Sequence, residues 1–190
     1  MLQALLVSTG VVALAEMGDK TQLLSLVLAA RFRRPWPIIW GILLATLANH
    51  ALAGVLGAWL QGALGPVWLR WILGLSFIAM AAWMLVPDKL DDTQAPERPW
   101  GAFVTTLVTF FLVEIGDKTQ VATVALAARY DALAMVVMGT TLGMMLANVP
   151  AVLLGERIVR RVPIRRVHQV AAAVFALLGV LVLAGVGDLF

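Results

Sequence analysis

Two short charged stretches, each set inside a long apolar segment, constrain this chain more than any other feature. Residues 16–22 read EMGDKTQ and residues 114–120 read EIGDKTQ. Each stretch carries two carboxylates and one ammonium group, and a charge at the centre of a membrane-spanning helix costs roughly 2.5–3.5 kcal/mol. Left unpaired, these charges would together cost on the order of 15–20 kcal/mol, more than a fold of this size has to spare. The fold must therefore bring them to one another, to a cavity or to a bound ion.

The composition is that of a membrane protein. Of the 190 residues, 62% are hydrophobic and 13% are charged, whereas a soluble domain is nearer half apolar and one quarter charged. The chain has no cysteine, which excludes disulfides, thiolate metal sites and thiol redox chemistry. Its basic residues lie in short loops and form no basic face, so we exclude nucleic acid as a partner. No nucleotide-binding loop is present either.

Six apolar segments are each about long enough to cross a hydrocarbon core of roughly 30 Å. They cover approximately residues 2–31, 36–60, 67–86, 100–129, 132–155 and 167–188. The polar stretch 87–99 divides them into two sets of three. We therefore predict an all-α integral membrane protein with six transmembrane helices, in which residues 1–86 and 100–190 form one transport domain and residues 87–99 form a cytoplasmic linker.

The two halves are related in sequence. Residues 16–31 and 114–129 are identical at ten of sixteen aligned positions, at a spacing of 98 residues. Because each half has three segments, the second half must enter the membrane from the opposite side, which predicts inverted repeats about a pseudo-two-fold axis in the membrane plane. The inner loops then hold ten Lys and Arg residues and the outer loops only Arg70 and Arg129. This bias predicts that both termini lie outside.

The first and fourth segments are too long for a straight, perpendicular span. A continuous helix over the first segment would be roughly 45 Å long. We therefore predict that both segments tilt or break at their charged stretches, with Gly18 and Gly116 as the points of weakness. On a continuous helix, Glu16, Asp19 and Lys20 would share one face, as would their counterparts in the second stretch.

Charge and ligand chemistry predict a divalent-cation site shared by the two stretches. The carboxylates of Glu16, Asp19, Glu114 and Asp117, with the ammonium groups of Lys20 and Lys118, sum to −2 when all are ionised. One divalent cation or two protons would neutralise that charge, which is what a cation/proton exchanger requires. The two lysines either hold the acids when the ion is absent or pair only within their own stretch. An all-oxygen site suits Mg²⁺, Ca²⁺ or Mn²⁺ better than Cu(I) or Zn²⁺.

Further oxygen donors surround the acids in the sequence. Gln22 and Gln120 are candidate ligands, directly or through water, or else interhelical hydrogen-bond partners. Asn49 and Asn148 recur in both halves, which favours a role at the site over simple helix packing. His50 has no counterpart and either relays protons or is hydrogen-bonded between helices. The hydroxyls of Thr21 and Thr119 are secondary candidates. Gly139 and Gly143 form a G-x-x-x-G pattern, which is typical of close helix packing.

The doubled Glu-x-Gly-Asp-Lys-Thr motif resembles the Gdt family of divalent-cation/proton exchangers, whose bacterial members are MneA-like manganese exporters. The resemblance covers essentially the whole chain. It implies a transporter rather than an enzyme, with Mn²⁺ or Ca²⁺ exchanged for protons, the motif acids as the site, and no cofactor beyond the transported ion. The chain lacks the long extensions of organellar relatives, which favours a bacterial inner membrane with both termini periplasmic.

Three other functions remain open from the residues. A divalent-cation channel could use the same acids without proton coupling. An exporter of a small organic cation would need a larger cavity with fewer crowded acids. An intramembrane hydrolase could use paired carboxylates, although the lysine beside each aspartate and the duplication favour a symmetric ion path. The expected partners are the metal ion, protons and lipid, and nothing in the sequence indicates an oligomer.

Overall fold

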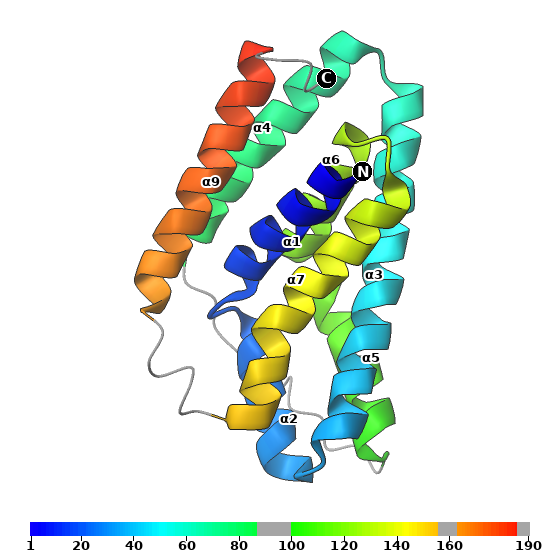
Figure 1. The fold of residues 1–190 in the computed structure, drawn as a ribbon, viewed down its shortest axis with the longest axis vertical. Helices are drawn as coiled ribbons and strands as arrows, with labels where there is room; N and C mark the ends of the chain where they lie inside the picture. Colours follow the sequence, from blue (N-terminus) through cyan, green and yellow to red (C-terminus); the bar gives the residue numbers. More distant parts are fainter. Residues whose placement is uncertain (87–99, 156–162, 186–190) are drawn as a thin grey trace.

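The fold was determined as a computed structural model, which describes residues 1–86, 100–155 and 163–185. All the regular secondary structure in these ranges is helical (Figure 1). The helices are α1 (Leu2–Glu16), α2 (Lys20–Phe32), α3 (Pro35–Ala63), α4 (Pro66–Met84), α5 (Ala102–Glu114), α6 (Lys118–Arg129), α7 (Leu133–Leu154) and α9 (Ile164–Ala184). A broken pair followed by two long helices therefore occurs twice along the chain.

Proline and glycine mark several helix boundaries, as the sequence predicts. Pro35 and Pro66 occupy the first turns of α3 and α4, where the missing N–H of proline costs no hydrogen bond. Pro163 directly precedes α9, and Gly185 ends it in the left-handed conformation that glycine adopts without strain. The predicted linker 87–99 lies outside the described residues.

Helix lengths and composition make this a multi-pass membrane protein. Among the described residues, α3, α4, α7 and α9 are long and apolar enough to cross a bilayer, and α1 with α2 counts as a fifth span bent by 70°. By the same measure α5 is a shorter apolar helix. The predicted all-α membrane fold is confirmed, and the number of six spans stays a prediction.

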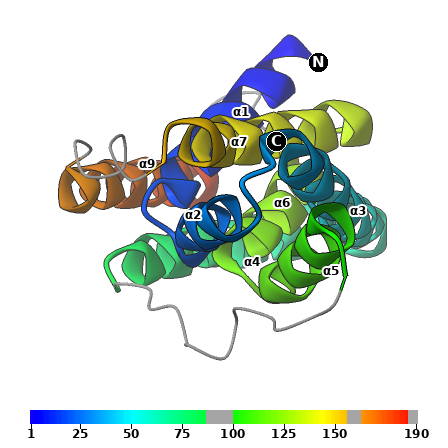
Figure 2. The ribbon, with the colours of Figure 1, turned by 90° about the horizontal axis from the view of Figure 1, so that it is seen from below.

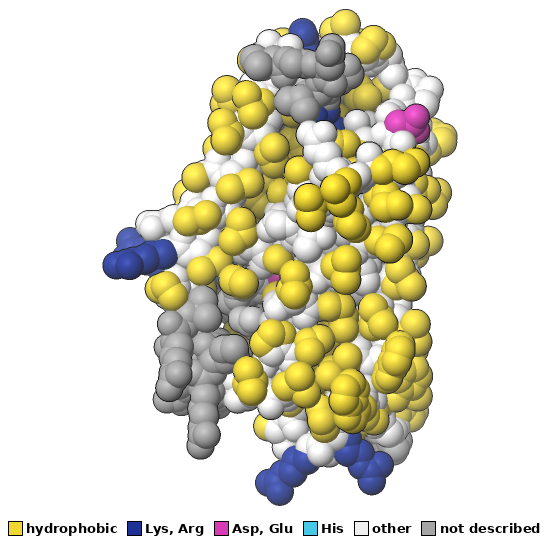
Figure 3. All heavy atoms as spheres, in the orientation of Figure 1, with side chains coloured by type: hydrophobic (Ala, Val, Ile, Leu, Met, Phe, Trp, Pro, Cys, Tyr) yellow, Lys and Arg dark blue, Asp and Glu magenta, His cyan; other side chains and the backbone are white. Residues whose placement is uncertain are grey.

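The outer surface of the bundle is apolar. On the face shown in Figure 3, hydrophobic side chains cover most of the visible height, and Lys and Arg side chains gather near helix ends. Each of the seven tryptophans is at least 40% exposed. A soluble monomer rarely exposes so much contiguous apolar area, whereas lipid-facing helices require it.

The helices pack so that the breaks lie inside the bundle. α1 lies along α7, α5 lies along α3, and α3 contacts α7 (Figures 1 and 2). One buried apolar cluster joins α1 and α6 with α4, α7 and α9, and a second joins α2 and α5 with α3 and α7. The joints between α1 and α2 and between α5 and α6 therefore sit between two apolar cores.

Two glycines allow α7 to approach α1 closely. A methyl group added at Gly139 would lie 2.6 Å from the carbonyl oxygen of Leu5, and one added at Gly143 would lie 2.6 Å from that of Thr9. Small residues at such positions let helix backbones pack against each other in membranes. The G-x-x-x-G pattern thus serves helix packing.

Adding a methyl group at this contact should loosen the bundle. We expect Gly143→Ala to lower stability by about 1–3 kcal/mol, because the backbone of α1 must move away. The measurement is the thermal unfolding midpoint of the detergent-purified protein. Gly10→Ala is the matched control, since no atom lies within 4 Å of a methyl group added there. Equal midpoints for the two variants would contradict the packing role.

Candidate cation site

The first helix break is a tight turn at the charged stretch. α1 ends at Glu16, and the N–H of Asp19 donates to the carbonyl oxygen of Glu16 over 3.1 Å. Met17 has φ −65° and ψ 112°, and Gly18 has φ +84°. These angles are those of a type II turn, whose third position needs positive φ and so favours glycine. Asp19 then begins α2 as its N-cap residue.

The second break repeats the first closely. Asp117 N–H donates to Glu114 carbonyl oxygen over 3.1 Å. Ile115 has φ −63° and ψ 119°, and Gly116 has φ +77°. Asp117 is the N-cap of α6 and accepts from the N–H of Thr119. Both long segments are therefore broken at the glycines that the sequence singles out.

Because the first segment is broken, Glu16, Asp19 and Lys20 do not share one face of a continuous helix. Glu16 closes α1 and Lys20 opens α2, and the two helix axes differ by 70°. The turn, rather than helical periodicity, sets how the three side chains are arranged.

In each stretch, the threonine and the glutamine form hydrogen bonds that stabilise the helix break of that stretch. Thr21 Oγ1 donates to Glu16 Oε2 over 2.5 Å, and Gln22 Oε1 accepts from the N–H of Gly18 over 3.0 Å. The glutamine thereby satisfies an N–H group that the broken helix leaves unpaired.

The equivalent bonds occur in the second stretch. Thr119 Oγ1 donates to Glu114 Oε2 over 3.2 Å, and Gln120 Oε1 accepts from the N–H of Gly116 over 2.7 Å. The threonine, glutamine, glutamate and glycine of each motif therefore have a hydrogen-bond partner within their own motif.

The lysines pair across the two stretches. Lys20 Nζ lies 2.8 Å from Asp117 Oδ1, and Lys118 Nζ lies 3.2 Å from Asp19 Oδ1. The side chain of Lys118 is 2% exposed and that of Lys20 is 22% exposed. Both recorded salt bridges of the lysines therefore join one stretch to the other, and the role of the lysines in the absence of the ion stays a prediction. Reciprocal pairing compensates buried charge and ties the two breaks together.

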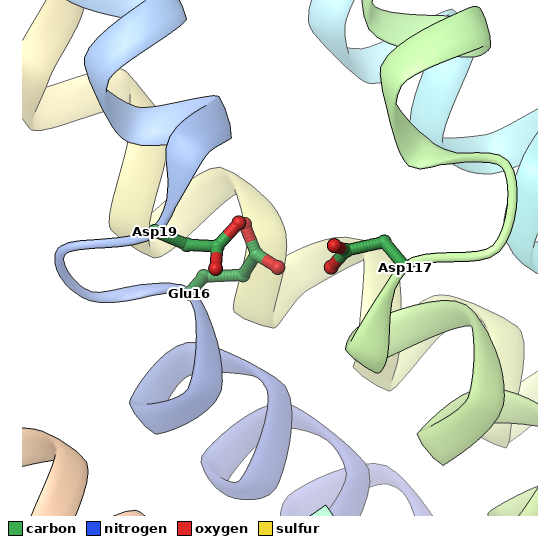
Figure 4. A group of neighbouring side chains, drawn as sticks. All are labelled: Glu16, Asp19 and Asp117. Carbon is green, nitrogen blue, oxygen red and sulfur yellow. The ribbon is translucent and has the colours of Figure 1, made fainter. Parts of the chain in front are cut away.

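Three carboxylates gather where the breaks meet. Glu16 and Asp19 flank the first turn and point toward Asp117 from the second (Figure 4). One oxygen from each of these groups lies within 4.8 Å of the other two, and all three side chains are buried. The group that could hold a metal ion does not include Glu114. Glu16 Oε1 and Glu114 Oε1 are both buried with no hydrogen-bond partner among the described residues.

Asn49 connects the second break to α3. Its amide nitrogen donates to the carbonyl oxygen of Phe111 over 3.0 Å, and its oxygen accepts from Gln120 Nε2 over 3.4 Å. Phe111 lies in the last turn of α5, so Asn49 satisfies a carbonyl group that the break frees.

Asn148 and Gln22 connect the first break to α7. Gln22 Nε2 donates to the carbonyl oxygen of Ala147 over 2.8 Å, and Asn148 Oδ1 accepts from Ser25 Oγ over 2.7 Å. Interhelical hydrogen bonding is thus recorded for all four predicted amides, and ligation by them stays a prediction. The sequence analysis missed Ser25, although the matching position of the second half, Thr123, also carries a hydroxyl.

His50 is fully buried in α3, and neither ring nitrogen has a hydrogen-bond partner among the described residues. The expected hydrogen bond between helices is therefore not recorded there. Its role in proton relay stays a prediction.

An all-helical membrane protein with buried, paired charges at two helix breaks belongs to the class of membrane ion transporters. Comparison with known proteins supports that class. The model of the family described as "Divalent cation/proton antiporter GDT1" matches residues 4–92 and 102–188. The chain therefore belongs to the divalent cation/proton antiporter GDT1 family, and it is a cation transporter rather than an enzyme.

The chain is similar to individual members of this family. It is 52% identical to a protein of Vibrio cholerae named "Putative manganese exporter", over 93% of this chain and 88% of the relative. It is 28% identical to a GDT1-like protein of Synechocystis, over 95% of this chain and 96% of the relative. No solved structure matches the chain.

A double-mutant cycle should reveal the reciprocal pairing. Lys118→Met leaves the Asp19 carboxylate buried without its ammonium partner, which should cost about 3–5 kcal/mol of unfolding free energy. Adding Asp19→Asn should recover about 1–3 kcal/mol, because the two residues interact directly. The free energy is measured by SDS titration of protein in mixed micelles.

The matched control for that cycle is Asp117→Asn in the Lys118→Met background. It removes the carboxylate that pairs with Lys20, so it should recover less unfolding free energy than Asp19→Asn does. Equal recovery by both substitutions would contradict the pairing of Lys118 with Asp19.

Proposed function

We propose that this protein exports a divalent cation, Mn²⁺ foremost, in exchange for protons, by alternating access around the joint of the two breaks. The observation that carries the proposal is the buried group formed by Glu16, Asp19 and Asp117, whose oxygens approach within 4.8 Å. At that separation two ionised carboxylates repel by about 3 kcal/mol even at an effective dielectric constant of 20. A bound divalent cation or added protons would relieve this repulsion.

The lysines allow the charge of the site to be compensated both with and without a bound cation. In the ion-free state, Lys20 and Lys118 compensate Asp117 and Asp19. A cation that enters between the aspartates replaces this compensation, and Glu16 Oε1 supplies an oxygen that otherwise lacks a partner. Glu114, whose Oε1 is equally buried and unpartnered, is the residue that we assign, with Glu16, to carrying the two protons of the ion-free state, and both glutamates release them when the cation binds. Loss of two protons for each cation bound would keep the charge of the site constant.

Manganese is the ion that the donor set and the relatives favour. The candidate ligands are all oxygen atoms, which suits Mn²⁺, Ca²⁺ and Mg²⁺. Half of the aligned residues are shared with a protein named as a manganese exporter. Ca²⁺ is the second candidate, and the amide oxygens of Gln22, Gln120, Asn49 and Asn148 would complete the coordination after rearrangement.

The proposed architecture is two inverted three-helix repeats in a bacterial inner membrane. Residues 1–86 and 100–190 form one transport domain, and residues 87–99 form a cytoplasmic linker. Two observations support the repeat: the order of broken and unbroken helices occurs twice, and the two turns have matching backbone angles. The start of α1 and the end of α9 both lie toward the upper end in Figure 1, which fits termini on one side, the periplasm.

Two rival functions would use the same residues differently. A channel would conduct the cation with no counterflow of protons. An exporter of an organic cation would need space between the acids, and carboxylate oxygens within 4.8 Å favour a bare metal ion instead.

Removing either cross-paired aspartate should abolish transport. In liposomes that contain a manganese-sensitive dye and a pH dye, we expect Asp19→Asn and Asp117→Asn to reduce manganese and proton flux to background, because each removes a charged ligand. Both variants should still insert in the membrane. The same assay with Mn²⁺, Ca²⁺ and Mg²⁺ measures selectivity.

Asp131→Asn is the matched control for these variants, because Asp131 is an exposed aspartate in the loop between α6 and α7. It should transport like the unmodified protein. Manganese flux without proton counterflow would favour the channel, and no metal flux in the unmodified protein would overturn the proposal.

Exchange of two protons for one cation should be insensitive to voltage. We expect the final manganese accumulation in liposomes to be the same with and without a potassium-diffusion potential set by valinomycin. If one net charge moved per cycle, a potential of 100 mV would contribute about 2.3 kcal/mol and change the accumulation ratio about fiftyfold. Such a change would contradict the two-proton stoichiometry.

A further inference from the structure

Helices α4 and α9 form a separate pair at one flank of the bundle (Figure 1). They cross where the rings of Phe77 and Phe175 meet, with centroids 6.2 Å apart. These two residues are 98 positions apart, the spacing that also separates Glu16 from Glu114. The crossing therefore pairs equivalent residues of the two halves, as expected where a pseudo-two-fold axis passes. We call α4 and α9 the arm.

One end of the arm covers the first break. The side chain of Ile164 lies over Gly18, where it occupies the space that a Cβ would take. One turn further along α9, His168 Nε2 donates to the carbonyl oxygen of Met17 over 2.8 Å. Met17 is the second residue of the turn, so this bond satisfies a carbonyl group that the turn directs away from the helix.

A cavity of about 600 Å³ opens beside this contact. It is lined by the C-terminal end of α4, at Met84 and Leu85, and by Arg165, His168 and Gln169 of α9, and it reaches Gly18. The arm therefore has an open space, lined by both apolar and polar side chains, at the end where it touches the first break.

The second break has no such cover among the described residues. A methyl group added at Gly116 would have no neighbour within 4 Å, and Ile115 is 56% exposed. The positions of the arm that lie 98 residues before Ile164 and His168 are Pro66 and Arg70. Arg70 Nε is buried with no hydrogen-bond partner among the described residues.

The helices that the arm contacts also differ between the two halves of the chain. In the described ranges, α9 packs on α1 and α4 packs on α6. The repeat would make two other pairings equivalent to these: α4 with α5, and α9 with α2. In the described ranges, neither of these two pairs makes more than marginal contact. The arm thus packs against α1 and α6 and makes little or no contact with α2 and α5.

We propose that the arm alternately covers the two breaks, with His168 and Arg70 as reciprocal positioning residues. In the present arrangement His168 holds the carbonyl oxygen of Met17. In the opposite arrangement the arm swings about its Phe77–Phe175 crossing, and Arg70 donates to the carbonyl oxygen of Ile115 while the bond of His168 is lost. Inverted repeats require that each half can adopt the conformation of the other. The inference rests on the proposed function for its purpose, since it names the element that exposes the cation site to one side at a time.

Cysteine cross-linking can test the exchange directly, because the natural chain has no cysteine. The pair Met17→Cys with Ile164→Cys reports the present arrangement, and the pair Ile115→Cys with Pro66→Cys reports the opposite one. Both pairs leave His168 and Arg70 in place. The full-length protein is reconstituted in liposomes and treated with a short bifunctional thiol reagent, and the yields of the two cross-links are compared.

Changes at the two positioning residues should move the yields in opposite directions. His168→Leu should raise the ratio of the cross-link between positions 115 and 66 to the cross-link between positions 17 and 164. The expected increase is about three- to tenfold, the effect of losing one hydrogen bond. Arg70→Leu should lower this ratio by a similar factor. His168→Gln, which retains a donor, should restore the ratio. Arg166→Leu removes an exposed charge of α9 and should leave the ratio unchanged.

A third pair, Gly74→Cys with Leu183→Cys, joins α4 to α9 within the arm, where the Leu183 side chain occupies the space that a Cβ at Gly74 would take. It should cross-link in every variant and shows that the arm is folded. If that pair forms but the ratio is unchanged by His168→Leu and Arg70→Leu, or shifts in the same direction with both, the inference is overturned. Absence of manganese flux in the unmodified protein would overturn the proposed function instead, and the cross-link ratio would still decide the arrangement of the arm.

Discussion

The fold depends on an exchange of charges between its two helix breaks. Lys20 pairs with Asp117, and Lys118 pairs with Asp19, so neither break can bury its charges alone. In a low-dielectric interior a buried charge is tolerated only when it is paired and hydrogen-bonded. This requirement draws the two halves of the chain together at one point, and the apolar helices arrange themselves around it.

The turns make that exchange possible. A continuous helix would have kept every backbone group bonded internally and left no reason for polar side chains nearby. Each type II turn instead frees backbone groups, and the chain satisfies them with side chains such as Gln22, Gln120 and Asn49. Irregular backbone inside a membrane protein is stable only with such partners. The same turns leave carboxylates of both halves close enough to hold one cation.

The arm relates this local chemistry to transport. The two breaks are nearly identical in backbone angles, yet α9 covers only the first of them. A site made of equivalent halves with unequal surroundings is what alternating access requires, because exchange of the surroundings would move the opening to the other side. The site would keep its composition while its access changes.

Much of this protein follows from its sequence alone. Hydrophobic runs of membrane-spanning length predict helices close to those observed. A glycine that lies among charged residues in mid-segment predicts each break, because these are local properties. The duplication predicts that the motifs converge. Only the tertiary structure decided that the lysines cross-pair, that the group of possible metal ligands contains Glu16, Asp19 and Asp117, and that His168 contacts Met17. These contacts join residues about 100 or more positions apart, and their geometry depends on how far helices tilt and slide in packing, which periodicity and composition leave undetermined.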